Sequence, residues 1–378
     1  IRRGDTPIKN WTQTYLEWDA FPNHLKVDGD EVIKYEVKRH GCFGCPIRCK
    51  GWANVNRQPA DINKGTTPEY QSIAMMGPNC LIDAIEPIIT GNNLCNQYGL
   101  DTIGVGGVIA WAMECYEKGV ITNQDTDGVQ LTWGNGEAFL MLIEKIAFRD
   151  GFGAVLADGT KLAAERIGQG SEEWAMHVGG QEIPAHAPLA SLGCCWGYVC
   201  DPTPARHTAS QFMHSHDQKV PFVLSQELHL PEAYDPEDME ANAKIYATCQ
   251  SLDRLWTSSG MCNFALWSEY FPLEEAMRAL TGWEDFTLVE GLNAGRRIQT
   301  LRQAFNIREG VDTTAWKIPK RLAEEPSTGT IKGRKVDLDA MKRNGYKALG
   351  WDPDTGIPLE STLEEQGLTS LVGPLSRV

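Results

Sequence analysis

Residues 41–49 have the sequence Gly-Cys-Phe-Gly-Cys-Pro-Ile-Arg-Cys, which sets Cys42, Cys45 and Cys49 in a C-x2-C-x3-C spacing. Three thiolates this close in sequence can converge on one soft metal centre, and thiolate sulfur selects iron–sulfur clusters, zinc or copper(I). The spacing differs from the ferredoxin run C-x2-C-x2-C-x3-C, so a fourth ligand has to come from a distant part of the chain. A distant ligand ties the metal centre to the tertiary fold, which favours an enzyme over a small cluster-binding module.

An iron–sulfur cluster is the favoured occupant of this segment. A zinc site would normally be completed by a second C-x2-C pair, and none follows in the sequence. Gly41, Gly44 and Pro46 predict a tight loop, which argues against three cysteines packed in a core element. Basic residues on both sides of the loop would offset the negative charge of a thiolate-bound cluster. They are Lys38, Arg39, Arg48 and Lys50.

The fourth ligand remains open when only residue spacing is considered. Cys80, Cys95 and Cys115 lie in or beside helical patterns, so we expect them to be packed thiols. Cys194, Cys195 and Cys200 lie in an irregular region near His207 and form a less favoured candidate for a second metal site. Cys262 follows the flexible turn Ser-Ser-Gly-Met, where a backbone can approach a cofactor closely.

The composition is that of a globular chain. The chain has 378 residues, of which 42% are hydrophobic and 22% charged, and this length suffices for roughly two or three domains. A net charge of −15 argues against a nucleic-acid partner, which would require a basic face. We expect no membrane span and no secretory signal, because the apolar runs are too short. Eleven cysteines, an odd number, favour reduced thiols and metal ligation in the cytoplasm over a disulfide framework.

Apolar residues recur at helical spacing through most of the chain, and few segments alternate with period two. We therefore predict a mainly α-helical protein. Thr287 and Glu290 form a capping box at the start of one helix, and Gly350 is expected to end another. The clearest periodic segments are residues 82–89, 108–116 before Gly119, 139–148 before Gly151, 287–305 and 338–349.

Two irregular regions interrupt the helical pattern. Residues 184–235 are rich in Pro, His, Cys and Gly and are predicted to be long functional loops. Residues 318–335 contain several Pro and Gly residues and are predicted to be a surface linker. A domain boundary after the third helix would divide the chain into residues 1–150 and 151–378.

Two residues are candidates for acid–base chemistry. Glu69 lies in Thr-Pro-Glu-Tyr at the start of a predicted helix. A carboxylate that interacts favourably with the helix dipole is a simpler interpretation of this residue than an acid–base role. His177 lies in Ala-Met-His-Val-Gly-Gly before a loop, and a surface or core histidine is the simpler interpretation. Asp101 is a candidate helix N-cap. The glycines at 104, 106 and 107 are too irregular for a dinucleotide fingerprint.

Read together, these segments resemble the aldehyde:ferredoxin oxidoreductase family of tungsten enzymes. The likeness extends over essentially the whole chain and keeps the order of the family's segments. The matching segments are residues 41–49, Pro68-Glu-Tyr70, Asn79-Cys80, residues 94–102, 112–117, Ala175-Met-His-Val178, Glu182-Ile-Pro-Ala185, residues 260–264, Leu280-Thr-Gly-Trp283 and residues 304–310.

The resemblance implies a role for each matching position. Cys42, Cys45, Cys49 and Cys262 correspond to the four ligands of a [4Fe–4S] cluster. Glu69 and His177 correspond to a carboxylate and an imidazole beside the tungsten, or molybdenum, of a bis-pterin centre. The remaining matches fall on two pterin-contact motifs. They are Asn96, Gly99, Leu100 and Asp101 in the first motif, and Thr257, Gly260, Met261 and Cys262 in the second.

The chain also departs from the family pattern. Asn96 and Thr257 stand where each pterin motif usually begins with an acidic residue, and Gly179 replaces a lysine that is common two residues after the histidine. His186-Ala-Pro188 replaces an Asp-Pro-Arg segment. The family's N-terminal, mostly β-sheet, pterin-binding domain is not represented. The resemblance therefore implies two multihelical domains enclosing the cluster and one side of the tungsten site, with the missing domain fused upstream or supplied as a separate subunit.

The function implied is oxidation of a small aldehyde with water to a carboxylic acid, with electrons passing through the cluster to ferredoxin. Glu69 would be the general base, a role that calls for a buried carboxylate, and His177 would donate a hydrogen bond to the carbonyl oxygen. The basic residues around the cysteine loop would guide an acidic carrier. Alternatives are a tungsten-dependent reductase of the aromatic acyl-CoA type, an iron–sulfur electron-transfer protein without tungsten chemistry, and a zinc-stapled helical interaction module.

Overall fold

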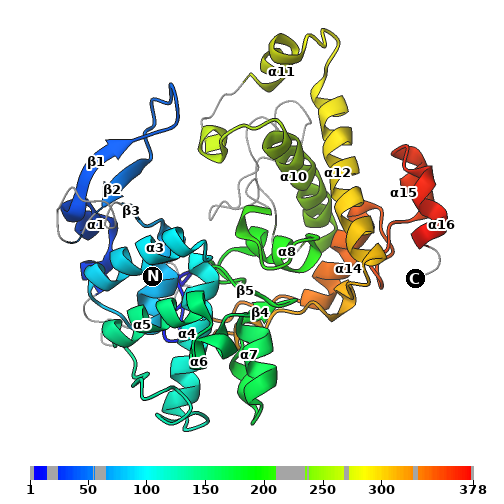
Figure 1. Ribbon diagram of the computed structural model, residues 1–378. Coiled ribbons are helices and arrows are strands. Elements are labelled where there is room, and N and C mark those ends of the chain that lie inside the picture. The colour runs from blue at the N-terminus through cyan, green and yellow to red at the C-terminus, as the bar shows by residue number, and fades with distance from the viewer. Residues whose placement is uncertain are drawn as a thin grey trace. The chain divides into compact units, whose positions relative to one another are not determined.

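The computed structural model describes residues 4–14, 24–53, 55, 65–209, 235, 238–267, 272–326 and 331–375 (Figure 1). The predicted mainly helical fold is confirmed in these residues. The chain divides into two compact units, Ile1–Ala190 with Pro319–Arg334, and Ser191–Ile318 with Lys335–Val378. The boundary expected at residue 150 falls inside the first unit, because the helices that follow it pack against the helices that precede it.

The first unit contains eight α-helices among the described residues, three short 3-10 turns and two small antiparallel sheets. The helices are α1 (Gly29–Tyr35), α2 (Tyr70–Met76), α3 (Ile85–Tyr98), α4 (Thr102–Glu117), α5 (Gly136–Phe148), α6 (Phe152–Leu156), α7 (Thr160–Ile167) and α13 (Lys320–Ala323). The 3-10 turns are η1 (His24–Val27), η2 (Pro78–Cys80) and η3 (Ser171–Trp174). The first sheet pairs β1 (Glu36–His40), β2 (Lys50–Ala53) and β3 (Gly65–Thr66) in that order, and the second pairs β4 (His177–Val178) with β5 (Gln181–Glu182).

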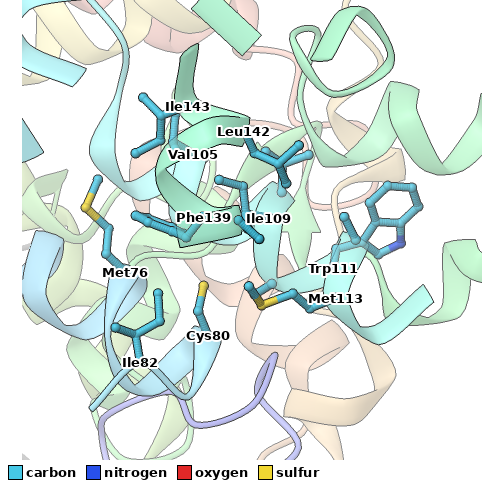
Figure 2. Close-up of a cluster of buried hydrophobic side chains, with 14 of the residues drawn as sticks. Met76, Cys80, Ile82, Val105, Ile109, Trp111, Met113, Phe139, Leu142 and Ile143 are labelled. Atoms are coloured by element: carbon cyan, nitrogen blue, oxygen red, sulfur yellow. The ribbon is translucent and has the colours of Figure 1, made fainter. Parts of the chain in front are cut away.

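Helix α4 lies at the centre of this unit. Every residue from Val105 to Cys115 is buried, so other elements cover the helix on all sides, and Glu114 is the one charged residue in this stretch. Side chains of α5, among them Phe139 and Leu142, belong to the same core as Ile109 of α4 (Figure 2). Cys80, Cys95 and Cys115 are also buried in this core, as expected for packed thiols.

Local signals explain where the helices of this unit begin and end. The Asp101 carboxylate accepts the backbone N–H groups of Ile103 and Gly104 at the start of α4, which confirms its predicted role as N-cap. Helix α5 ends at Arg149, which takes the left-handed conformation at φ 52° two residues before the expected stop at Gly151. Gly151 precedes α6 instead.

The segment expected to be a surface linker, residues 318–335, belongs partly to the first unit. The Arg321 guanidinium donates to both carboxylate oxygens of Glu114 in α4, at 2.8 and 2.9 Å. Glu114 is 2% exposed and also accepts from Asn10 Nδ2 at 2.6 Å. The linker prediction was therefore wrong for this stretch, because a buried carboxylate requires charged and hydrogen-bonding partners.

The second unit is built around α10 (Met239–Ser258), which packs against α12 (Leu288–Arg308) and α14 (Leu338–Leu349). Thr287 Oγ1 accepts the Glu290 N–H at the start of α12, and Gly350 ends α14 at φ 79°, so both predicted helix boundaries are confirmed. The remaining elements are α8 (Leu192–Cys200), η5 (Asn263–Trp267), α11 (Leu273–Thr281), η6 (Thr313–Ala315), α15 (Glu360–Glu365), η7 (Thr369–Leu371) and α16 (Val372–Leu375).

Helix α8 corrects the prediction of continuous loops over residues 184–235. All nine of its residues are buried, so it lacks the polar face that would have identified it as a helix by periodicity. Residues 210–234, which are about half of the predicted loop region, and residues 236–237 lie outside the described residues.

Candidate cluster and cofactor site

The three clustered cysteines lie in the loop that joins β1 to β2. The loop closes on itself: the Cys45 N–H donates to the Cys42 carbonyl at 3.0 Å, and Arg48 Nη2 donates to the Arg39 carbonyl at 3.0 Å. Gly44 has a φ of 69°, a conformation that glycine adopts without strain. A Cβ atom on Gly41 would lie 2.9 Å from the Cα of Arg48, so only glycine permits this close return of the chain. The sequence thus builds a compact loop that carries all three thiols.

The exposure of the cysteines separates the predicted ligands from the others. All eleven cysteines lie in the part of the chain that the structure describes, and seven of them are buried. The four that are not fully buried are Cys42, Cys45, Cys49 and Cys262. Cluster ligation requires thiolates, and burial raises the pKa of Cys95, Cys115 and Cys195 to about 12. The donor set at the four predicted positions therefore fits an iron–sulfur cluster, whereas the buried thiols do not.

The alternative metal site at Cys194, Cys195 and Cys200 is not formed. These thiols are buried within α8 and its end, and no group of three His, Cys, Asp or Glu side chains among the described residues is arranged to hold a metal ion. Cys42, Cys45 and Cys49 do not form such a group in the described residues either.

Cys262 belongs to the second unit and follows the C-terminus of α10. The Thr257 hydroxyl donates to the Asp253 carbonyl at 2.7 Å, one helical turn earlier. Gly260 has a φ of 76°, and the Cys262 carbonyl accepts the Trp256 indole N–H at 3.1 Å. Thr257, Gly260 and Cys262 are exposed and Met261 is partly exposed. The segment predicted to be the second pterin-contact motif is therefore an accessible turn at a helix end.

The segment predicted to be the first pterin-contact motif connects α3 to α4 in the first unit. Gly99 ends α3 at φ 70°, and the Leu100 N–H donates to the Cys95 carbonyl at 2.9 Å. Asp101 then caps α4. Asn96 is exposed on the last turn of α3, with its amide 3.5 Å from Thr66 Oγ1. The same residues that reverse the chain between two helices thus present polar groups at the surface of the unit.

Glu69 is the N-cap residue of α2, but its side chain makes no capping hydrogen bond. It contacts Lys50 Nζ instead, at the start of β2. The backbone explains this proximity, because the Thr67 N–H donates to the Gly51 carbonyl at 2.8 Å and holds residues 65–69 beside β2. The Glu69 side chain is 50% exposed, so the described residues do not provide the burial expected of a general base.

His177 lies at the start of the β4–β5 hairpin. Gly179 and Gly180 form its two-residue turn at φ 63° and 97°, which accounts for glycine at the position where the family pattern has lysine. The Gly180 N–H donates to His177 Nδ1 at 3.3 Å, and burial lowers the pKa of the imidazole. The neutral ring therefore carries its proton on Nε2, which makes Nε2 a hydrogen-bond donor.

Two hydrogen bonds connect the helix of Glu69 to the chain that follows His177. The Tyr70 hydroxyl donates to the Ala185 carbonyl at 2.8 Å, and the Ala185 N–H donates to Gln71 Oε1 at 2.6 Å. The structure thus assembles Glu69, His177 and the cysteine loop on one unit. Sequence reasoning did not recognise Tyr70 or Lys50 as partners in this arrangement. The sequence signals available were the place of Tyr70 in the matching segment Pro68-Glu-Tyr70 and that of Lys50 among the basic residues beside the loop.

None of the helices that the structure describes combines the length and the apolar character needed to cross a membrane.

A family model described as aldehyde ferredoxin oxidoreductase, domains 2 and 3, matches residues 1–368. The chain is 35% identical over 371 residues to the tungsten-containing aldehyde ferredoxin oxidoreductase of Pyrococcus furiosus, covering 96% of this chain and 57% of that protein. It is 34% identical over 363 residues to the protein of the same name from Thermococcus kodakarensis, covering 93% of this chain and 56% of that protein. The chain therefore spans little more than half the length of these relatives.

Two further relatives have other names. An aliphatic sulfonate oxidoreductase, WOR-like subunit, of Pyrococcus furiosus is 27% identical over 392 residues, covering 100% of this chain and 57% of that protein. Among solved structures, the active-site complex BamBC of benzoyl coenzyme A reductase, with bound 1,5-dienoyl-CoA, superposes with a TM-score of 0.74. That match covers 100% of this chain and 59% of the other chain at 20% identity, so it establishes a shared fold.

Proposed function

The chain belongs to the aldehyde ferredoxin oxidoreductase family, and from this premise we propose that, together with an N-terminal pterin-binding domain, fused or separate, it oxidises an aldehyde to a carboxylic acid. The reaction consumes one aldehyde and one water and releases two electrons and two protons. The observation that supports this proposal most strongly is that the only cysteines not fully buried are the four at the family's cluster positions.

Each group of residues has a defined part in this proposal. Cys42, Cys45, Cys49 and Cys262 would hold a [4Fe–4S] cluster. The two accessible helix-end motifs would contact the pterins, through Asn96, Gly99, Leu100 and Asp101 in the first unit and Thr257, Gly260 and Met261 in the second. When bound, the tungsten bis-pterin would accept an electron pair and the cluster would release it in single-electron steps.

Glu69 would remove a proton from the attacking water or from the aldehyde hydrate. Its carboxylate is accessible, and the contact with Lys50 restricts the directions in which it can point. Exclusion of bulk water from Glu69 would require groups beyond those that surround it in the described residues of the first unit.

His177 would donate its Nε2–H to the carbonyl oxygen as negative charge develops there. The Gly180 N–H fixes the tautomer that this requires, and a neutral imidazole is maintained by burial. A donor that is oriented before the reaction stabilises developing charge without reorganisation, which is the basis of oxyanion stabilisation.

Ferredoxin, or a similar acidic carrier, would receive the electrons near the cysteine loop. Arg39 forms an ion pair with Glu36 at 3.1 Å and Lys50 contacts Glu69, so part of the basic charge near the loop is already neutralised within the chain. Lys38 and Arg48 are exposed beside the loop. If Lys38 and Arg48 guide the carrier, the rate at which the carrier is reduced should fall as the salt concentration rises.

The test is turnover by the complete protein, isolated without oxygen, with metal analysis. Oxidation of aldehydes by a viologen dye, with tungsten and about four iron atoms per chain, is the expected result. The shared fold with the benzoyl-CoA reductase complex makes aromatic acyl-CoA thioesters the necessary comparison. If the protein turned over thioesters and not aldehydes, its function would be reduction of an aromatic ring and not oxidation of an aldehyde. Iron without tungsten would indicate an electron-transfer protein. Zinc alone would rule out both a tungsten enzyme and an iron–sulfur electron-transfer protein.

A further inference from the structure

Arg48 has an unusual backbone conformation within the cysteine loop. Its φ is 48°, in the left-handed region that residues with a side chain rarely adopt, whereas Gly44 of the same loop reaches a φ of 69° without strain. Backbone strain of this kind persists only where the surrounding structure imposes it, and it is common at functional sites. Arg48 directly precedes Cys49, one of the four proposed cluster ligands. An arginine at a position that favours glycine therefore calls for a contribution from its side chain.

The Arg48 side chain fastens the end of the loop to β1. Arg48 Nη2 donates to the Arg39 carbonyl at 3.0 Å, and Arg39 Nη1 donates in return to the Arg48 carbonyl at 3.5 Å. Arg39 Nε also pairs with the Glu36 carboxylate at 3.1 Å, and the Glu36 side chain packs against Gly51 of β2. The two arginines thus connect the residue before Cys49 to both strands that carry the loop.

These side-chain hydrogen bonds matter because the loop has little other support. The β1–β2 ladder ends before residues 41–49 begin. Among the described residues, this stretch makes one backbone–backbone hydrogen bond, which is donated by Cys45. Cys49 takes no part in that bond. The backbone of Cys49 is therefore held by its two neighbours, Lys50 in the ladder and Arg48 through its guanidinium.

We propose that Arg48 is a positioning residue for the cluster: its guanidinium holds Cys49 in the place from which the thiolate binds iron. This inference rests on the proposed function, which assigns a [4Fe–4S] cluster to the loop cysteines and Cys262. Arg48 acts through the backbone of the loop and is not a ligand. Compensation of the cluster's negative charge is a different effect, which Arg48 shares with the other basic residues around the loop.

The test compares Arg48→Gly and Arg48→Lys with wild type in the complete protein, isolated without oxygen. Glycine suits the left-handed backbone but removes the guanidinium. Lysine keeps the positive charge, but an ammonium on a flexible stem does not reproduce the fixed geometry of a guanidinium. The measurements are iron content, the rate of iron release to a ferrous chelator after reduction, the midpoint potential of the cluster by EPR, and the melting temperature.

Arg149 provides the matched control within the first unit. It is also an arginine in the left-handed conformation, at φ 52°, and it ends α5. Its exposed guanidinium pairs with Asp158 at 2.6 Å. Arg149→Gly and Arg149→Lys therefore repeat the same changes of backbone preference and charge outside the cysteine loop. Both are expected to release iron at the wild-type rate and to keep the wild-type potential.

Both Arg48 variants are expected to release iron about tenfold faster than wild type, in line with the effect of other residues that orient metal ligands. The midpoint potential should fall in Arg48→Gly, because a positive charge is lost, and should stay at the wild-type value in Arg48→Lys. A role limited to charge would lower the potential of the glycine variant and leave iron release unchanged in both variants. That result would overturn the proposal.

Equal acceleration of iron release in the Arg48 and Arg149 variants would also overturn the proposal, since general loosening of the unit would then explain it. If Arg48→Gly does not fold, Arg48→Lys and Arg149→Lys decide the question. A wild-type protein that holds the cluster but does not oxidise aldehydes would refute the proposed function alone, because none of these measurements uses an aldehyde. A wild-type protein without iron would overturn both proposals.

Discussion

Lys50 Nζ contacts the Glu69 carboxylate although 19 residues separate them in sequence. Lys50 follows the last cysteine of the cluster loop, and Glu69 precedes α2. The contact arises because β2 lies between β1 and the segment that leads from β3 to α2. One short strand therefore joins the loop proposed to hold the cluster to the carboxylate proposed as general base.

Replacing Lys50 by Met should impair turnover more than stability. An exposed ion pair of this kind contributes only about 0.2–1 kcal/mol to the free energy of unfolding. Loss of the partner that orients Glu69 is expected to lower kcat about tenfold. The control is Lys34→Met, which removes an exposed ion pair with Glu31 in α1. Equal kcat values for the two variants would show that Lys50 does not orient Glu69.

Replacing Glu69 by Gln should lower kcat by about 10²- to 10⁴-fold while tungsten and iron contents stay unchanged, because an amide cannot accept the proton. The measurement is kcat with metal analysis of the same preparation. Glu137→Gln is the control, since Glu137 also lies in the first turn of a helix and tests the helix-dipole interpretation of Glu69. Activity of Glu69→Gln within a few-fold of wild type would exclude a general-base role.

His177 should make stability depend on pH in the acidic range. Burial lowers its pKa from 6.5 in the folded state, so the unfolded chain binds the proton more readily between the lowered pKa and 6.5. Stability therefore rises with pH through that window and becomes independent of His177 above about 6.5. Wild type should gain melting temperature relative to His177→Gln as pH rises from about 5 to about 6.5. A constant difference between the two proteins from pH 5 to 7.5 would contradict this assignment.

Removing a proposed cluster ligand should remove iron. Cys42→Ala and Cys262→Ala are expected to lose the cluster and its low-temperature EPR signal after reduction, because three thiolates hold a [4Fe–4S] cluster poorly. Cys95→Ala and Cys249→Ala are matched controls, since these thiols are buried and their removal leaves all four proposed ligands in place. Full iron content in Cys262→Ala would mean that the fourth ligand is another group.

Replacing Arg321 by Met should destabilise the first unit strongly. The substitution leaves the buried Glu114 carboxylate without its guanidinium, which costs about 3–5 kcal/mol. The double variant Arg321→Met with Glu114→Met is expected to recover a large part of this loss, because no buried charge remains. Chemical denaturation of the three variants measures the coupling, and additive effects would show that the pair acts independently.

Short-range signals allowed much of the helical architecture to be predicted. Thr287 begins α12 and Gly350 ends α14 as expected, because caps act within one turn of the backbone that they terminate. Helix α8 was missed because it is buried on every side, and Arg149 was not anticipated as the end of α5 because a non-glycine residue in the left-handed conformation has no clear sequence signal.

The sequence by itself determined the set of reactive groups and the local backbone conformation around them. The loop of Cys42, Cys45 and Cys49 depends on neighbouring glycines, and the His177 tautomer depends on a backbone N–H three residues away. Only the tertiary structure decided that Cys194, Cys195, Cys200 and Cys249 are also buried, that Lys50 contacts Glu69, and that Glu182 accepts a hydrogen bond at the start of α7. These outcomes require segments distant in sequence to pack together, and burial, unlike a turn or a cap, is a property of the packed whole.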